Sequence, residues 1–286
     1  MTKPKLYSFF SAKGGTGKTA LVTTFAFALA ARGERVAVLD ADFTGTSIAD
    51  GLALEAPDGA GGHLSQDATR AARLQPDGGG LPFLDAAMAP DAAFDPRAWA
   101  WRHPEAPQIA WYPSSPLTAH HQRVRNNVLE PSTAAVAARL AALITAITAA
   151  EGGGATVVLV DLGPGIFGVP GAVAKAAALV RANFTALLVS TPDWNDLLRS
   201  ADIAKMLIVD DQPVRWLLNR NEDAPLEQVV KALRQRIGGG QTHGVWDVLE
   251  GFGAHERLRG LYGRDTIGFT PEELRRLGDV LLCGGF

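Results

Sequence analysis

A lysine and three glycines with the chemistry to bind phosphate lie near the N-terminus, in Phe9-Phe-Ser-Ala-Lys-Gly-Gly-Thr-Gly-Lys-Thr19. Glycines let successive backbone N–H groups turn towards an anion, and the N-terminus of a following helix adds favourable electrostatics. Lys18 can place its ammonium against the β- and γ-phosphates, and the hydroxyl of Thr19 suits Mg²⁺. The predicted nucleotide-binding residues of this loop are Gly14, Gly15, Thr16, Gly17, Lys18, Thr19 and Ala20.

Carboxylates end two apolar segments further along the chain. Val36-Ala-Val-Leu-Asp-Ala-Asp42 carries Asp40 and Asp42, and Thr156-Val-Val-Leu-Val-Asp161 ends in Asp161. If the chain stays extended, the side chains of Asp40 and Asp42 point to the same side of it. Acids at the end of a strand otherwise commonly act as capping groups, so that alternative stays open.

Short apolar runs alternate with longer Ala/Leu-rich stretches of helical period around these residues. This alternation is typical of parallel strands joined by crossover helices, and it predicts an α/β fold with a doubly wound, largely parallel sheet and helices on both faces. Strands are predicted at Leu6–Phe10, Val36–Asp40, Thr156–Asp161, Thr185–Ser190 and Val214–Asn219. Helices are predicted at Gly17–Ala31, Ser132–Ala149, Trp194–Leu207, Pro225–Ile237 and Pro271–Leu282.

The N-terminal loop resembles the deviant Walker A motif of ParA/MinD-type ATPases, because Lys13 precedes the first glycine pair. The resemblance implies a P-loop NTPase fold, ATP and Mg²⁺ as cofactors, and a homodimer that forms on ATP binding. It also implies that Lys18 and Lys13 are catalytic, with Lys13 reaching across the dimer to the other subunit's phosphates. A second cation near the bridging oxygens would stabilise charge that develops on the leaving group.

The segment Phe43-Thr-Gly-Thr-Ser-Ile looks like the switch I of this family. By this match Asp42 is a catalytic residue that orients and polarises the attacking water. Asp40 is by the same match a metal ligand or a structural partner. The family often has Asp-Pro after this point, whereas this chain has Phe43 and Thr44.

The segment Asp161-Leu-Gly-Pro-Gly165 looks like the end of a Walker B strand followed by switch II. The resemblance implies that Asp161 holds Mg²⁺ through water, beside Thr19, and that the N–H of Gly165 senses the γ-phosphate. The family pattern D-x-P-x-G is broken at Gly163, while Gly165 keeps the expected offset. Loss of the proline is expected to loosen the switch.

The segment Arg215-Trp-Leu-Leu-Asn219-Arg220 resembles the strand end at which an Asn of this family reads the adenine edge. An amide offers both a donor and an acceptor, which matches adenine. The guanine-reading T/N-K-x-D sequence is absent, so ATP is favoured over GTP. Asn219 is therefore a predicted nucleotide-binding residue, and a turn-forming asparagine is the alternative.

The chain is expected to form one ATPase domain over residues 1–286, with a less regular insertion at about 51–131. That segment is rich in Gly, Pro and Ala, and within it Gln108-Ile-Ala-Trp-Tyr-Pro-Ser-Ser resembles a short strand of the family. No run approaches the roughly 18 apolar residues of a membrane span. The single cysteine, Cys283, cannot form an internal disulfide, and the cytoplasm is the expected compartment.

The expected function is an ATPase that hydrolyses ATP slowly without an activating protein partner and acts as a nucleotide switch in positioning or partitioning a cellular cargo. Two alternatives stay open: a P-loop small-molecule kinase or amidoligase, and a nucleotide-gated scaffold with negligible hydrolysis.

The surface on which such a switch would act is the least defined part of the prediction. With 27 Lys and Arg against 30 Asp and Glu, the net charge of −3 argues against nucleic-acid binding by bulk charge. Nonspecific DNA nevertheless stays open as a partner through Lys231, Arg234 and Arg236. A membrane surface is disfavoured, because acids weaken the attraction of helix Pro271–Leu282 to anionic lipid.

Overall fold

The computed structural model describes most of the chain up to Asn219. The described residues are 3–45, 48–75, 77–149, 151, 153–209 and 214–219, with single positions at 231, 270, 272 and 275. The helices predicted at Pro225–Ile237 and Pro271–Leu282, and the basic stripe of the first, lie outside the described residues apart from such single positions.

A seven-stranded sheet forms the centre of the described part, in the order β3-β4-β2-β5-β1-β6-β7. The strands are β1 (Lys5–Phe10), β2 (Val36–Ala41), β3 (Trp101–His103), β4 (Ala106–Tyr112), β5 (Val157–Leu162), β6 (Asn183–Ser190) and β7 (Val214–Leu218). All neighbouring strands run parallel except β3, which pairs antiparallel with β4 at one edge.

Helices of very different length connect these strands. The longer helices are α1 (Lys18–Ala31), α3 (Gln66–Arg73), α7 (Thr133–Thr148), α8 (Val169–Leu179) and α9 (Trp194–Val209). The short ones are α2 (Ile48–Gly51), η1 (Gly78–Gly80), α4 (Leu84–Ala87), α5 (Pro96–Trp99), η2 (Thr118–His120), α6 (His121–Val124) and η3 (Arg125–Leu129).

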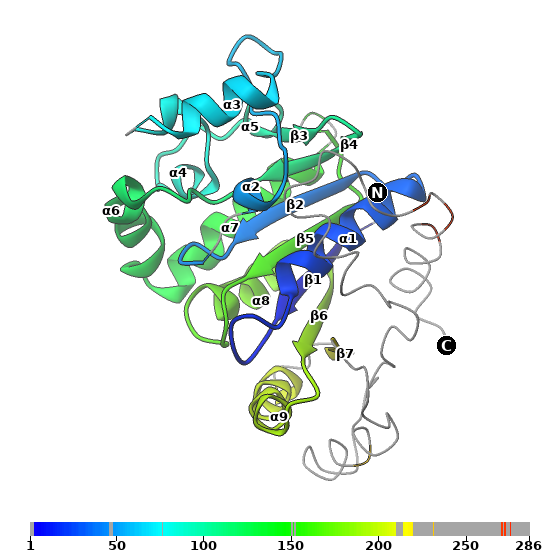
Figure 1. Ribbon diagram of the computed structural model, residues 1–286. Coiled ribbons are helices and arrows are strands. Elements are labelled where there is room, and N and C mark those ends of the chain that lie inside the picture. The colour runs from blue at the N-terminus through cyan, green and yellow to red at the C-terminus, as the bar shows by residue number, and fades with distance from the viewer. Residues whose placement is uncertain are drawn as a thin grey trace.

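Helices cover both faces of the sheet, with α1 in front and α7 and α8 behind it in Figure 1. Alternate residues of a strand point to opposite faces. Leu6 and Phe10 of β1 accordingly pack into a core with α7, α8 and α9, whereas Tyr7 and Phe9 pack into a second core with α1. Burial on both faces explains the nearly continuous apolar runs of the central strands. The predicted α/β fold with a doubly wound, largely parallel sheet is confirmed.

The predicted elements within the described residues are also confirmed. All five predicted strands, and the helices predicted at Gly17–Ala31, Ser132–Ala149 and Trp194–Leu207, are present with ends within two residues. Helix α7 begins where Ser132 caps it, because the Ser132 hydroxyl accepts a hydrogen bond from the N–H of Ala135. Helix α8 was not predicted.

The segment at about residues 51–131 contributes to the sheet as well as to its surroundings. Strand β4 pairs with β2 and extends the sheet beyond it. Trp101 of β3 and Trp111 of β4 are fully buried in the core that also holds α1. The remaining elements of the segment are α3 and several short helices, which lie together at one end of the sheet in Figure 1.

A buried carboxylate holds part of this segment together. Asp85 in α4 is fully buried and pairs with Arg123, with 2.5 Å between Oδ2 and Nε. Its other oxygen accepts a hydrogen bond from the N–H of Ser115. The hydroxyl of Ser115 in turn lies 2.7 Å from Nδ1 of His120. The loop after β4 is thus tied to both α4 and α6.

We expect Asp85→Ala to lower the free energy of unfolding by about 3 kcal/mol, because it leaves the partly buried guanidinium of Arg123 without its carboxylate. The matched control is Glu130→Ala, since the Glu130–Arg125 pair is 54% and 64% exposed. A pair in solvent contributes little, so this variant should lose less than about 1 kcal/mol. Urea unfolding of both variants measures the difference, and equal losses would contradict a structural role for Asp85.

Within the described residues, no single helix is long and apolar enough to cross a membrane. Thr118–Leu129 and Thr133–Thr148, bent by 101°, meet the length and composition requirements only as a pair. The apolar side of α7, the second member of that pair, is buried in the core.

Candidate functional site

The loop between β1 and α1 turns at glycines that its backbone requires. Gly15 and Gly17 have φ angles of 76° and 88°, a left-handed conformation that glycine adopts at little cost. A Cβ built on Gly14 or Gly15 would meet no atom within 4 Å, so the space beside this part of the loop is open. An open, glycine-lined turn at the start of a helix fits the phosphates of a nucleotide.

Lys18, the first residue of α1, is only 6% exposed. Its Nζ donates a hydrogen bond to the hydroxyl of Ser11 at 2.7 Å, and that hydroxyl donates to the carbonyl oxygen of Lys13. Burial lowers the pKa of the Lys18 ammonium, and the negative charges of Asp161 and Asp42 partly oppose this change. The ammonium is therefore held inside the loop, beside the carboxylates of neighbouring strands.

Asp161 is a buried carboxylate at the end of β5, in register with Asp40 of β2. It is 1% exposed, and neither oxygen has a hydrogen-bond partner among the described residues. Burial, followed by the charge of Asp40, raises the pKa of Asp161 to about 7. Thr19 and the charge of Lys18 lower the pKa of Asp161. The Thr19 hydroxyl nevertheless does not meet the geometry of a hydrogen bond to either carboxylate oxygen. A buried carboxylate without partners is unfavourable.

A bound divalent cation would offset the free-energy cost of burying the Asp161 carboxylate. Thr19 and Asp161 supply oxygen ligands, and Mg²⁺ is usually bound by one or two protein groups together with waters and substrate phosphates. The described part of the chain contains no group of three or more His, Cys, Asp and Glu side chains that could hold a metal by themselves. The residues present thus fit Mg²⁺ bound together with a nucleotide.

Asp40 lies beside Asp161 but is already engaged by the protein. Its Oδ2 accepts hydrogen bonds from the N–H of Ile48 at 2.9 Å and from the hydroxyl and N–H of Ser114 at 2.9 and 3.2 Å. Burial raises the pKa of Asp40 to about 6, against the effect of these hydrogen bonds. The carboxylate ties β2 to the start of α2 and to the loop after β4. Of the two roles predicted for Asp40, this geometry suits that of a structural partner. The role of Asp40 as a metal ligand stays a prediction.

Asp42 lies between the two predicted switch segments. A Cβ built on Gly45 would lie 2.4 Å from one carboxylate oxygen of Asp42, and a Cβ built on Gly163 would lie 3.1 Å from the other. The departure from the family pattern at Gly163 therefore falls at the position that approaches Asp42. A side chain there would press on the carboxylate, so the glycine gives Asp42 room.

Gly165 connects the predicted switch II to the phosphate loop. It has a φ angle of 96°, and its N–H donates a hydrogen bond to the carbonyl oxygen of Ser11 at 2.8 Å. To sense a γ-phosphate, this N–H would have to leave Ser11. The predicted sensing role is thus coupled to a movement of the segment against the loop.

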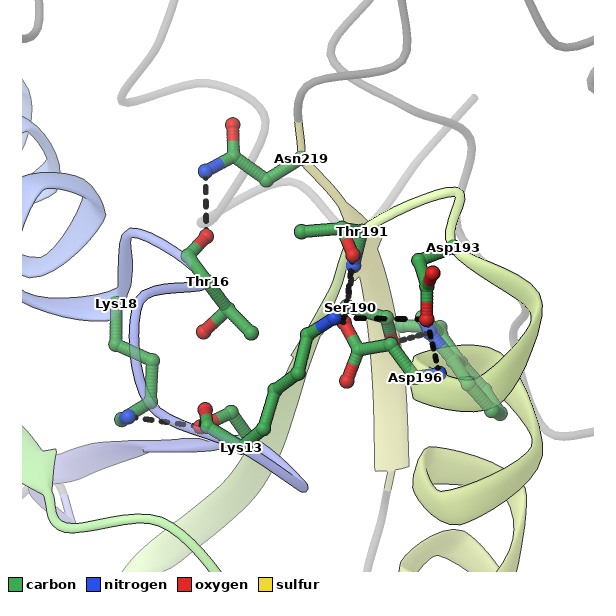
Figure 2. A network of polar contacts seen from close by, with 10 residues as sticks. Lys13, Thr16, Lys18, Ser190, Thr191, Asp193, Asp196 and Asn219 are labelled. Atoms are coloured by element: carbon green, nitrogen blue, oxygen red, sulfur yellow. Dashed lines mark hydrogen bonds and ion pairs between the residues drawn. The ribbon is translucent and has the colours of Figure 1, made fainter.

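Lys13 pairs with acids of its own chain at the start of α9. Its Nζ lies 3.5 Å from Oδ1 of Asp193 and 4.0 Å from Oδ2 of Asp196. Figure 2 shows the Lys13 side chain extending towards these acids. Asp196 is buried and its Oδ2 is already held by the N–H and hydroxyl of Thr191. The side chains of Lys13 and Asp193 are 40% and 52% exposed, and an ion pair in solvent contributes at most about 1 kcal/mol. The contact of Lys13 with Asp193 can therefore break at little cost, and the contact with Asp196 is long at 4.0 Å.

Asn219 lies at the end of β7 and also contacts the phosphate loop (Figure 2). Its Nδ2 donates a hydrogen bond to the carbonyl oxygen of Thr16 at 2.7 Å. The structure thus brings every predicted site residue to the loop or to the strand ends beside it, and their roles stay predictions.

Four polar residues of this region were not predicted: Ser11, Ser114, Asp193 and Asp196. Each holds a predicted residue, since Ser11 contacts Lys18, Ser114 contacts Asp40, and the two acids contact Lys13. A topological signal existed for the acids. They follow β6 at the carboxyl end of a parallel sheet, which is where ligands bind in such folds.

The sequence also matches a known protein family. Residues 7–245 match the family described as the CobQ/CobB/MinD/ParA nucleotide binding domain. A comparison with curated protein sequences finds no match.

Several solved structures share the fold over nearly their whole length. The cell division ATPase MinD of Pyrococcus furiosus is 17% identical, with a TM-score of 0.63 over 98% of this chain and 99% of that chain. The septum site-determining protein MinD of Pyrococcus horikoshii OT3, complexed with Mg-ADP, is 17% identical, with a TM-score of 0.57 over 99% and 98%. A putative plasmid partition protein of Borrelia burgdorferi B31, bound to AMPPNP, is 15% identical, with a TM-score of 0.58 over 99% and 100%. At these identities the similarity shows the fold alone, which is that of MinD and ParA P-loop NTPases.

Proposed function

The chain belongs to the family of CobQ/CobB/MinD/ParA nucleotide binding domains, and we propose that it is a Mg²⁺-dependent ATPase that forms an ATP-sandwiched homodimer. It acts as a nucleotide switch that positions or partitions a cellular cargo, hydrolyses ATP slowly alone, and is activated by a protein partner. We further propose one ATPase domain, with residues at about 51–131 inserted in it, and a cytoplasmic location.

The observation that carries this proposal is that a buried ammonium and a buried carboxylate without a hydrogen-bond partner both lie beside an open glycine loop. Lys18 is held within the loop, and both oxygens of Asp161 have no hydrogen-bond partner among the described residues. A protein that bound no cation here would leave this carboxylate unsatisfied at a free-energy cost. Bound Mg²⁺-ATP supplies the scissile phosphoanhydride bond and the positive charge that Asp161 needs.

The residues of the chain divide the work of hydrolysis. The glycine loop and Lys18 hold the phosphates, while Thr19 and Asp161 hold the metal. Asp42 orients the attacking water, and Lys13 of the other subunit stabilises charge on the leaving group. The weak cis contacts of Lys13 support this role, because they allow the side chain to reorient.

We expect ATP, but not ADP, to convert the purified chain from monomer to dimer in the presence of Mg²⁺. Lys13→Ala should weaken the ATP-dependent dimer, its hydrolysis, or both, because the second subunit then lacks its cation. Light scattering coupled to size exclusion measures the mass, and phosphate release measures hydrolysis. The matched control is Lys175→Ala, which removes an exposed lysine of α8. A chain that stays monomeric with bound ATP would contradict the proposed dimer.

The product of the reaction separates this proposal from its two alternatives. Phosphate that appears on an added metabolite, instead of as free phosphate, would indicate a small-molecule kinase or an amidoligase. ATP-dependent dimerisation without phosphate release, even with an activating partner, would indicate a nucleotide-gated scaffold. Parallel assays with DNA and with anionic liposomes test the two candidate surfaces.

A further inference from the structure

Asn219 connects three segments that lie far apart in the sequence. Its backbone N–H donates a hydrogen bond to the carbonyl oxygen of Ser190 at the end of β6. Its side-chain Nδ2 donates to the carbonyl oxygen of Thr16 at 2.7 Å. Figure 2 shows the amide pointing at the loop from the end of β7. The phosphate loop is thereby fastened to the edge of the sheet.

The contact falls at the place where the loop becomes helix α1. Thr16 is fully buried and precedes Gly17, the N-cap of α1, which is in turn followed by Lys18. A Cβ built on Gly17 would lie only 2.4 Å from Nδ2 of Asn219. The amide therefore packs directly against the bare Cα of Gly17 and is hydrogen-bonded to the residue before it.

Gly17 also has a left-handed backbone that few other residues adopt. A peptide group turned in this way needs a partner for its carbonyl oxygen, and Asn219 provides that partner for Thr16. The direction of the neighbouring N–H groups and the position of Lys18 depend on the same backbone.

We propose that Asn219 is a positioning residue that holds the phosphate loop in its binding conformation, and that it sets the affinity for the triphosphate of any nucleotide regardless of the base. This inference rests on the proposed function, namely that the loop binds a nucleotide. It differs from the role predicted from sequence, in which the same amide reads adenine.

The test measures the dissociation constants of three probes with Mg²⁺, on the full chain and on Asn219→Ala. The probes are ATP, inosine triphosphate, whose base lacks the amino group of adenine, and inorganic tripolyphosphate, which has no base. We expect the variant to bind each probe about tenfold more weakly, which is the scale of one lost hydrogen bond that leaves a buried carbonyl unsatisfied. The ratio of ATP to inosine triphosphate affinity should stay within about twofold of the native ratio.

Two outcomes overturn the inference. A loss confined to ATP, with tripolyphosphate binding unchanged, would make Asn219 a reader of the base. Unchanged affinity for all three probes would show that the contact does not organise the loop. A native chain that binds none of the probes instead removes the proposed function itself, so the two failures can be told apart.

Matched variants guard against a general loss of folding. Asn126→Ala removes an exposed asparagine and should leave all three constants unchanged. If Asn219→Ala unfolds, Asn219→Ser replaces it, because serine loses less packing. The Ser variant should again bind the three probes more weakly by a common factor. Thermal unfolding without ligand verifies that each variant is folded at the temperature of the titration.

Discussion

The affinity of the Lys18→Ala variant for Mg²⁺-ATP is expected to be at least about a hundredfold lower than that of the native chain. Truncating one member of a buried, hydrogen-bonded charge pair costs about 2–5 kcal/mol, and each 1.4 kcal/mol is a factor of ten. Lys18 is already buried and held by Ser11, so the native chain pays little to order it on binding. In the variant, Asp161 and Asp42 remain as negative charges near the phosphates.

Isothermal titration calorimetry at neutral pH measures this loss directly. Lys175→Ala, which changes the charge equally at an exposed position of α8, should bind ATP within about twofold of the native chain. Urea unfolding of both variants shows whether the fold is retained, because Lys18 contributes a buried side chain. If Lys18→Ala binds ATP as the native chain does, the glycine loop is not the nucleotide site.

The central strands could be predicted from sequence because both of their faces are buried. The run at Val36–Asp40, for example, corresponds to β2 at Val36–Ala41, in which every residue is buried. When helices cover both faces, a strand is a nearly continuous apolar run, and the polar residues beside the run mark its ends. The helix predicted at Ser132–Ala149 likewise starts at the residue whose hydroxyl caps α7 in the structure.

Helix α8 and strand β3 could not be predicted in the same way. Helix α8 begins after Gly168, at the end of the Gly- and Pro-rich run Gly163–Gly171, a composition that normally signals a loop. Its later residues, Ala172–Leu179, are rich in alanine, the strongest helix former, and they pack against α7 and the sheet, so the helix forms despite its Gly/Pro start. Strand β3 has three residues, too few for a visible alternation, and is stabilised by the burial of Trp101.

For the candidate site, the positions of the residues could be predicted from sequence but their contacts could not. Lys18, Asp161 and Asn219 could be located from sequence, since each follows or ends a strand that carries a recognisable pattern. Their contacts could not, because Asn219 and Thr16 are 203 positions apart. The pairing of Lys13 with Asp193 depends in addition on which rotamer a partly exposed lysine adopts.

Asp42→Ala is expected to lower ATP turnover by about a hundredfold or more, with little change in ATP affinity. A side chain that orients or activates the attacking water typically contributes a factor of 10² to 10⁴. Binding should persist because Asp42 carries the same sign of charge as the phosphates and is not among the groups predicted to hold them. The ATP-dependent dimer should therefore accumulate in the variant. Single-turnover phosphate release gives the rate, and light scattering gives the mass.

A control variant and a second variant beside Asp42 accompany this prediction. Asp91→Ala removes an exposed aspartate from the loop after α4 and should change neither turnover nor affinity. Gly163→Ala tests the space beside the carboxylate, because its Cβ would lie 3.1 Å from Oδ1 of Asp42. If Asp42 orients water, a displacement of its carboxylate should slow turnover in this variant as well. Turnover that is unaffected by Asp42→Ala would assign the attacking water to another group and leave Asp42 a structural link between Gly45 and Gly163.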